Sequence, residues 1–115
     1  MNKIIKVLHT EWSDGWGGQE IRILSESKAF IEKGYEMIIA AQPNGELFKQ
    51  SNQAEVPTIA LKMNKGLNLF SIFHLVSYIK DNQIDIVHTH SSVDSRTAGI
   101  AARIAGIKVV RSRHI

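Results

Sequence analysis

Five short apolar runs, rich in β-branched residues, alternate with segments of helical periodicity, and this alternation constrains the fold most strongly. The predicted strands are residues 3–8, 36–41, 57–61, 84–88 and 108–111. The predicted helices between them are residues 20–33, 46–52, 68–82 and 95–105. Strands joined by helical crossovers run parallel. With right-handed crossovers we predict an α/β fold, a Rossmann-like doubly wound parallel sheet in strand order 3-2-1-4-5 with helices on both faces.

Helical spacing also predicts the residues that form the core. The first helix has one apolar stripe, and the third helix, after its N-cap Asn68, has another. The two stripes are Ile23, Leu24, Ser27, Phe30 and Ile31, and then Leu69, Ile72, Phe73, Val76 and Ile79. The fourth helix is rich in alanine and glycine, which lets it lie close to a sheet. We expect Gly34 and Gly106 to end the first and fourth helices.

A glycine-rich stretch, residues 11–20, joins the first strand to the first helix and contains both tryptophans. It is no dinucleotide fingerprint, because Glu20 stands where the third glycine belongs and the second strand ends without an acidic residue. It is no Walker-type loop either, because Gly-Lys-Ser/Thr is missing. Gly17 and Gly18 at a helix N-terminus can approach a phosphate or sugar closely, or they simply make the turn.

Three polar segments follow the carboxyl ends of predicted strands one, four and five. They are the glycine-rich stretch, the loop at residues 88–94 and the segment at residues 111–114. In this strand order, strands one and four are neighbours with the topological switch between them. Ligands of such folds bind outside the strand ends at that switch, so we expect the three segments to form one site.

Histidines and arginines supply the chemistry of these segments. His88 and His90 lie two apart and point the same way on an extended chain. With His114 they are the candidate ligands of a metal-dependent hydrolase, but without cysteine support we predict no metal. We interpret His88 as a core residue and His90, in the loop, as a substrate ligand. Arg111 and Arg113 suit anionic groups or are solvated charges at a sheet edge.

Composition narrows the class of protein. The 115 residues suffice for one domain, and 43% hydrophobic and 22% charged residues are typical of a folded protein. The chain has no cysteine, which fits a reducing compartment. Its start does not form a signal peptide, and no run reaches the ~18 apolar residues that span a bilayer.

The mild positive charge bears on possible partners. A net charge of +3 is interpreted as a solvated surface, and we predict no nucleic-acid partner. A sharper alternative is peripheral contact with an anionic membrane through a mixed basic and apolar segment, namely Lys62, Lys65, Leu67, Leu69 and Phe70. The favoured interpretation of that segment is a loop leading into a core helix.

Four stretches together resemble the N-terminal half of family-4 glycosyltransferases of the GT-B fold. They are Ser-Asp-Gly-Trp-Gly-Gly-Gln-Glu at residues 13–20, Lys-Gly-Tyr-Glu at 33–36, Asp-Ile-Val-His-Thr-His-Ser at 85–91 and Val-Val-Arg-Ser-Arg-His at 109–114. The resemblance spans nearly the whole chain. The first and third stretches are fairly specific in combination, although each is weak alone.

This resemblance implies an enzyme of two Rossmann-like domains with a cleft between them. The N-terminal domain of such enzymes mostly binds the acceptor, and the C-terminal domain binds the sugar nucleotide and carries a pair of glutamates. Transfer retains the anomeric configuration and needs no metal or other cofactor. By resemblance, Gly17 and Gly18 lie near the donor diphosphate, His90 lies beside the transferred sugar, and His114 is a further histidine of the cleft.

We therefore expect residues 1–115 to be part of an N-terminal, acceptor-side domain, without its nucleotide-sugar domain and inactive alone. A sheet lacking its next helix would expose apolar surface and favour self-association. We expect the parent to transfer a sugar from a nucleotide-sugar donor to a glycan or glycolipid, such as lipopolysaccharide or capsule. We expect it to act in the cytoplasm, or peripherally at the inner membrane.

The candidate site follows from these expectations. His90 is the catalytic candidate, and Gly17 and Gly18 form the candidate donor-diphosphate loop. The candidate substrate-binding residues are Trp16, Gln19, Ser91, Arg111, Arg113 and His114. A tryptophan of the glycine-rich stretch can stack on a sugar ring. The alternative function is a non-catalytic module that binds sugar or phosphate.

Overall fold

A parallel sheet forms the centre of the molecule. The computed structural model describes residues 4–63 and 68–112. Its strands are β1 (Lys6–Glu11), β2 (Glu36–Ala41), β3 (Thr58–Ala60), β4 (Ile86–Thr89) and β5 (Lys108–Arg111). Every neighbouring pair is parallel, and the order is β3-β2-β1-β4-β5. The predicted α/β fold and strand order are confirmed, and β3 lies at an edge as expected.

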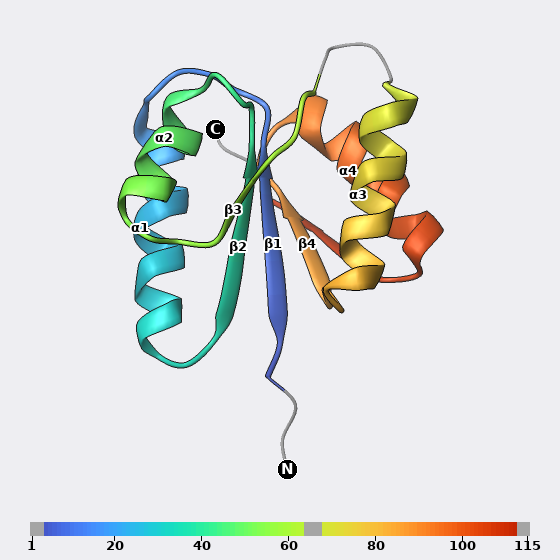
Figure 1. The fold of residues 1–115 in the computed structure, drawn as a ribbon, viewed down its shortest axis with the longest axis horizontal. Coiled ribbons are helices and arrows are strands. Elements are labelled where there is room, and N and C mark those ends of the chain that lie inside the picture. The colour runs from blue at the N-terminus through green and yellow to red at the C-terminus, as the bar shows by residue number, and fades with distance from the viewer. Residues whose placement is uncertain (1–3, 64–67, 113–115) are drawn as a thin grey trace.

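The described helices cover the two faces of this sheet (Figure 1). They are α1 (Gly18–Glu32), α2 (Glu46–Gln53), α3 (Leu69–Asp81) and α4 (Ser92–Ala105). Helices α1 and α2 lie on one face, and α3 and α4 lie together on the other. None of the helices in the described part of the chain is long and apolar enough to cross a bilayer.

Alternate residues of the strands enter two separate cores, as the period of a strand requires. The larger core lies against α3 and α4, and Leu8, Ile38 and Val87 supply its strand side. The smaller core lies against α1 and α2 and includes Ile39 and Ala41. The predicted close packing of α4 is confirmed, because its buried alanines are fully covered, namely Ala98, Ala101 and Ala102.

The first strand was predicted too early. It was expected at residues 3–8, but it begins at Lys6 and continues to Glu11, pairing with β2 along its whole length. Residues 1–3 lie outside the described part. The backbone N–H of Lys6 donates to Asp85 Oδ2 at 2.9 Å, which holds the start of the strand. The end of the strand was missed because His9, Thr10 and Glu11 have polar side chains but are buried.

The apolar stripe of α3 was also partly wrong. Leu69 and Phe73 are exposed, whereas Ser71 and Leu75 are buried. Asn68 is the N-cap, as predicted, and accepts from the Ser71 N–H at 3.2 Å. The Ser71 hydroxyl donates to the Lys62 carbonyl, which draws that side of the first turn inward. The buried stripe therefore follows Ile72, Leu75, Val76 and Ile79, and the helix leaves its remaining large apolar residues in solvent.

The face that carries α1 is only partly covered. Phe30, predicted in the core, is exposed and packs edge-on against Tyr35 with ring centroids 5.6 Å apart. All four residues of β5 are exposed, including Val109 and Val110. A groove of about 400 Å³ lies between α1 and the strands; Val7, His9, Ile86, His88 and Val110 are among the residues that line it. The expected uncovered apolar surface is present, and self-association stays a prediction.

Helix α4 ends where the sequence predicted, at a left-handed glycine. Gly106 has a φ of 77°, which a residue with a Cβ adopts at a cost of about 1 kcal/mol. Gly99 lies inside the same helix, and a Cβ added there would meet no atom within 4 Å. The two glycines of one helix therefore have opposite requirements.

We expect Gly106→Ala to lower the free energy of unfolding by about 1 kcal/mol because of backbone strain. Gly99→Ala should raise it by about 0.5–1 kcal/mol, because alanine restricts the unfolded chain and favours the helix. Urea unfolding followed by circular dichroism measures both changes. Equal effects of the two substitutions would contradict the assignment of Gly106 as the helix cap.

Candidate functional site

The candidate site lies at the carboxyl ends of β1 and β4, the two strands on either side of the topological switch. These strands pair in register from Val7 opposite Ile86 to Thr10 opposite Thr89. Beyond them, the glycine-rich stretch leads into α1 and the segment at residues 90–91 leads into α4. Arg111 ends β5 opposite Thr89, so the described part of the third segment reaches the same edge. The predicted convergence of the three segments is confirmed for these residues.

Asp94 is the residue that joins these segments. Its side chain is fully buried. Oδ2 accepts from Thr10 Oγ1 at 2.7 Å and from the His90 N–H at 2.9 Å. Oδ1 accepts from the Ser91 N–H at 2.8 Å and from the Ser91 hydroxyl. One carboxylate thus fixes the end of β1, the backbone of His90 and the first turn of α4.

This arrangement corrects the predicted loop at residues 88–94. Thr89 is the last residue of β4, Ser91 is the N-cap of α4, and α4 begins at Ser92 rather than at residue 95. Ser91 and Asp94 form a capping box, a pattern that the sequence displayed as Ser-x-x-Asp. Burial raises the pKa of Asp94, while its hydrogen bonds from Ser91, His90 and Thr10 act in the opposite direction.

Three imidazoles gather on the other side of the same strands. His9 of β1 lies opposite His88 of β4, with ring centroids 4.9 Å apart. His90 follows two residues after His88 on the same side, with centroids 4.3 Å apart, as the spacing predicted. His9 Nδ1 and His90 Nε2 are 2.9 Å apart and share a hydrogen bond. Among the described residues, these three histidines form a group that could hold a metal ion.

His9 is kept neutral by its surroundings. Burial lowers its pKa to about 3, and the neighbouring His88 contributes in the same direction. The sequence analysis missed His9 because the predicted first strand ended before it. A first strand extended to Glu11 would have placed His9 in the strand, facing the same way as the strand-four histidine.

The glycine-rich stretch is held by two buried glutamates. Gly17 is the N-cap of α1, and its N–H donates to Glu20 Oε2 at 2.9 Å. Glu11 accepts from the Ser13 N–H at 3.1 Å and from the Gln19 side-chain amide. Gly18 begins α1 and is exposed, so the helix N-terminus is open to an anion.

Glu11 has an unusual protonation equilibrium. Its side chain is only 1% exposed. Burial raises its pKa to about 7, the Ser13 N–H opposes that rise, and the negative charges of Asp94 and Glu20 add to it. The sequence offered no signal for this residue beyond its position at the start of the glycine-rich stretch.

The remaining candidate residues have varied positions. Trp16 is 39% exposed. Trp12 packs against the larger core, so its presence in the glycine-rich stretch has a structural reason. Gln19 is bound to Glu11, and Arg111 is exposed. Arg113 and His114 lie outside the described residues.

His90 lies past β4 in the loop before α4, as predicted, but the loop leaves its side chain buried. Its side chain is 6% exposed, because the residue directly follows β4 and its ring packs beside His88 and His9. His88, interpreted as a core residue, is half-buried, and its Nε2 is hydrogen-bonded to Ser112 Oγ.

A second hollow opens on the same edge of the sheet, beside the glycine-rich stretch. It has a volume of about 270 Å³ and is lined by Asp14, Gln42, Pro43, Asn44, Lys62 and Met63. The Gln42 amide donates to the Met63 carbonyl at 2.6 Å, and its oxygen accepts from the Met63 N–H at 3.1 Å. Gln42 therefore ties together the segments that follow β2 and β3 and forms one wall of the hollow.

In doubly wound α/β domains, ligands bind at the topological switch, and the polar segments of this chain meet at that place. The family model described as Glycosyltransferase Family 4 matches residues 16–115. The chain belongs to this glycosyltransferase family, and the resemblance seen in the sequence is confirmed.

Individual relatives agree with this assignment. The chain is 26% identical over 110 residues to the Escherichia coli UDP-Gal:alpha-D-GlcNAc-diphosphoundecaprenol alpha-1,3-galactosyltransferase, covering 92% of this chain and 28% of that protein. A glycosyltransferase structure from Rickettsia africae has a TM-score of 0.82 at 23% identity, covering 98% of this chain and 30% of that one. Anabaena HepE in complex with UDP has a TM-score of 0.75 at 16% identity, covering 93% and 29%. The chain thus spans less than a third of each relative.

The two buried groups His9 and Glu11 predict opposite effects of pH on stability. Native His9 stays neutral while its unfolded form binds a proton below about pH 6.5, so stability rises between pH 3 and 6.5. Native Glu11 keeps a proton that its unfolded form releases above about pH 4.5, so stability falls between pH 4.5 and 7. In the native protein the two slopes oppose each other.

We expect Glu11→Gln to remove the falling contribution, worth up to about 3 kcal/mol between pH 4.5 and 7. Relative to the unmodified chain, this variant should gain stability as the pH rises, and His9→Gln should lose it. Urea unfolding at pH 4.5, 5.5, 6.5 and 7.5 measures the slopes, with exposed Glu32→Gln as the control for net charge. Parallel pH profiles for all four proteins would contradict the assignment.

Proposed function

We propose that this chain is the acceptor-side part of a retaining glycosyltransferase that moves a sugar from a nucleotide-sugar donor to a glycan or glycolipid. The observation that carries the proposal is the meeting of two elements at the switch, the open N-terminus of α1 and the His90 segment held by Asp94. The E. coli relative, by its name, uses UDP-Gal and a lipid-linked diphosphate sugar, which supports this class of donor and acceptor. Lipopolysaccharide, capsule and related glycans are the products that we propose.

The donor diphosphate would lie against Gly17 and Gly18. Both residues are exposed, and the first turn of α1 presents backbone N–H groups and the positive end of the helix dipole. Glu11 and Glu20 fix the stretch from beneath through Ser13, Gln19 and Gly17. A preorganised set of N–H donors stabilises the charge that develops on a leaving diphosphate, so this step needs no metal.

His90 would orient the transferred sugar, with its backbone fixed by Asp94. Arg111, exposed at the end of β5, would offset anionic charge, together with Arg113. Ser91 and His114 complete the proposed substrate ligands. Trp16, the more exposed tryptophan, would stack on a sugar ring.

The acceptor would enter the hollow of about 270 Å³ beside the glycine-rich stretch. Its lining offers a carboxylate from Asp14, an amide from Asn44 and an ammonium group from Lys62. These groups suit sugar hydroxyls and phosphate. Because the chain spans less than a third of its relatives, we propose that a second domain supplies the other wall of the site. We also propose that this chain alone does not transfer sugar.

In a complete enzyme that contains this chain, we expect His90→Ala to lower kcat by about 100-fold, since a preorganised group at the reacting sugar contributes an effect of that size. Exposed His74→Ala on α3 is the matched control and should keep the full rate. Turnover of a radiolabelled nucleotide sugar measures both. A His90→Ala enzyme with the rate of the control would remove His90 from the mechanism.

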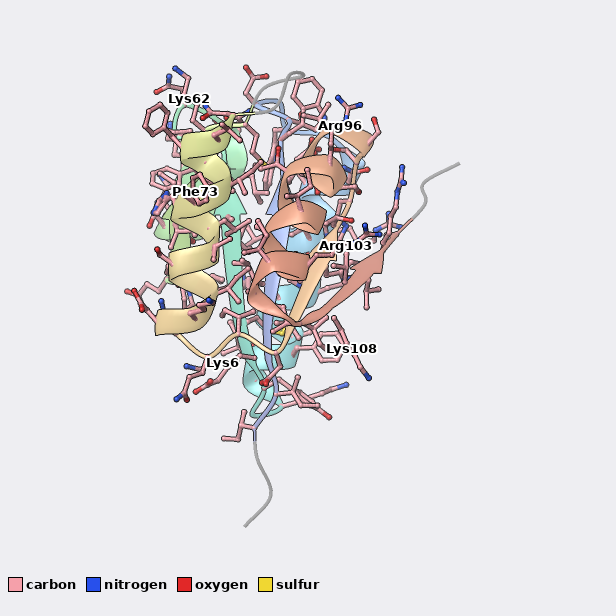
Figure 2. The ribbon with its side chains drawn as sticks, turned by 90° about the vertical axis from the view of Figure 1, so that its right-hand side faces the viewer. Lys6, Lys62, Phe73, Arg96, Arg103 and Lys108 are labelled. Atoms are coloured by element: carbon pink, nitrogen blue, oxygen red, sulfur yellow. The ribbon has the colours of Figure 1, made fainter. Side chains whose placement is uncertain are left out.

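We also propose that one end of the molecule contacts an anionic membrane, where a lipid-linked acceptor would reside. Phe70 is 89% exposed, and Leu69 and Phe73 beside it are also exposed on α3. Figure 2 shows Lys62 and Arg96 at the same end, and the Lys62 backbone contacts the first turn of α3. Apolar side chains flanked by cations are the pattern of an interfacial contact. Lys65 and Leu67 of the predicted segment lie outside the described residues.

Replacing both Phe70 and Phe73 with serine should weaken binding to phosphatidylglycerol vesicles by at least about tenfold, because two buried rings contribute more than 1.4 kcal/mol. Exposed Ile104→Ser, at the opposite end of α4, should leave binding unchanged. Co-sedimentation at low and high salt measures the effect. Equal binding to neutral phosphatidylcholine vesicles would contradict the role of the cations.

A further inference from the structure

We propose that His9, His88 and His90 bind one divalent late transition-metal ion, of which Zn²⁺ is the natural probe. Each residue offers one ring nitrogen, and these nitrogens all lie within 4.8 Å of one another. The sequence analysis weighed a metal site with His114 as the third ligand and rejected it. The structure supplies His9 instead, from the middle strand of the sheet.

The scaffold of this site is rigid. His9 and His88 lie opposite each other in the register of two parallel strands, and their side chains lie on the same face of the sheet. His90 comes from the same strand end, two residues on, and Asp94 fixes its backbone. Two of the three ligands occupy strand positions, which are held more precisely than positions in loops.

The chemistry of the three rings favours a metal. A nitrogen-only set of three imidazoles suits Zn²⁺, Cu²⁺ or Ni²⁺ and leaves a fourth position for water.

The distances require some adjustment. Zinc–nitrogen bonds of about 2.0–2.1 Å place tetrahedral ligand nitrogens roughly 3.4 Å apart. His9 Nδ1 and His90 Nε2 are 2.9 Å apart, and all three ligand nitrogens lie within 4.8 Å of one another, so binding would require side-chain rotations that bring the third nitrogen closer. Binding replaces the hydrogen bond between these two rings.

The surroundings supply a supporting partner and an entry path. His88 Nε2 is hydrogen-bonded to Ser112 Oγ, which would orient the ring. His9 and His88 both line the groove of about 400 Å³ beside α1, so an ion has access from solvent. The metal would link β1 to β4 and stabilise the fold. It would also take His90 away from a substrate, a consequence that rests on the proposed function although the binding itself does not.

The test uses the 115-residue chain after removal of metal with EDTA. Titration with Co²⁺ should give visible absorption bands of a four-coordinate site at one ion per chain, and Zn²⁺ should displace Co²⁺. His9→Gln and His88→Gln should each weaken binding at least about 100-fold, because even the loss of a supporting partner costs up to that factor. Exposed His74→Gln, on α3, should bind as the unmodified chain does.

A second measurement needs no variant. In ¹H–¹⁵N spectra of the imidazoles of the unmodified chain, Zn²⁺ should shift the signals of His9, His88 and His90 and leave the other two of the five histidines in place. The proposal is overturned if the unmodified chain binds no stoichiometric ion. It is equally overturned if the shifted signals belong to His74 or His114.

Discussion

The buried carboxylate of Asp94 is the interaction on which the candidate site depends. It accepts hydrogen bonds from β1, from the end of β4 and from the N-cap of α4. A carboxylate without partners is costly in a protein interior, so its position is defined by the donors around it. The same bonds that satisfy Asp94 therefore fix the distance between the two strands at the switch. Through them, the backbone of His90 has one position relative to Thr10.

The two faces of the sheet differ in how completely helices cover them. Helices α3 and α4 cover one face with a continuous apolar core. The other face is covered by α1 and α2 over β2 and β3, and the groove remains beside α1 over β1, β4 and β5. The histidine cluster lies under this open part. Polar residues on buried strand ends are tolerated there because they bond to one another and because the face is incompletely closed.

The ends of the strands concentrate groups whose protonation differs from that in water. Neutral His9 and a Glu11 that titrates near pH 7 lie two residues apart on β1. Their pKa values shift in opposite directions, because burial disfavours the charged form of each and one is a base and the other an acid. Glu11 in turn holds Gln19 and Ser13, so the shape of the glycine-rich stretch is linked to the state of a buried carboxyl group.

Local periodicity was a reliable guide to the elements and to their order. The strands at residues 36–41 and 108–111 were predicted with the same bounds that the structure has. The left-handed glycines at 34 and 106 were predicted from the signals that end helices. The site was predicted only in outline. His90, Gly17 and Gly18 were predicted to lie at this edge of the sheet. His9, Glu11 and Thr10 were missed, because polar residues inside a buried strand break the apolar pattern that marks a strand.

The sequence by itself determined the alternation of strands and helices, and right-handed crossovers in the usual doubly wound arrangement then predicted the sheet order. It also determined that polar segments meet at one edge. Only the tertiary structure decided which side chains touch there. Register places His9 opposite His88, and the rotation of α3 turns Phe73 outward and Leu75 inward. Such choices depend on packing against neighbours distant in the chain, such as α4 or β4, and one-dimensional periodicity contains no measure of those contacts.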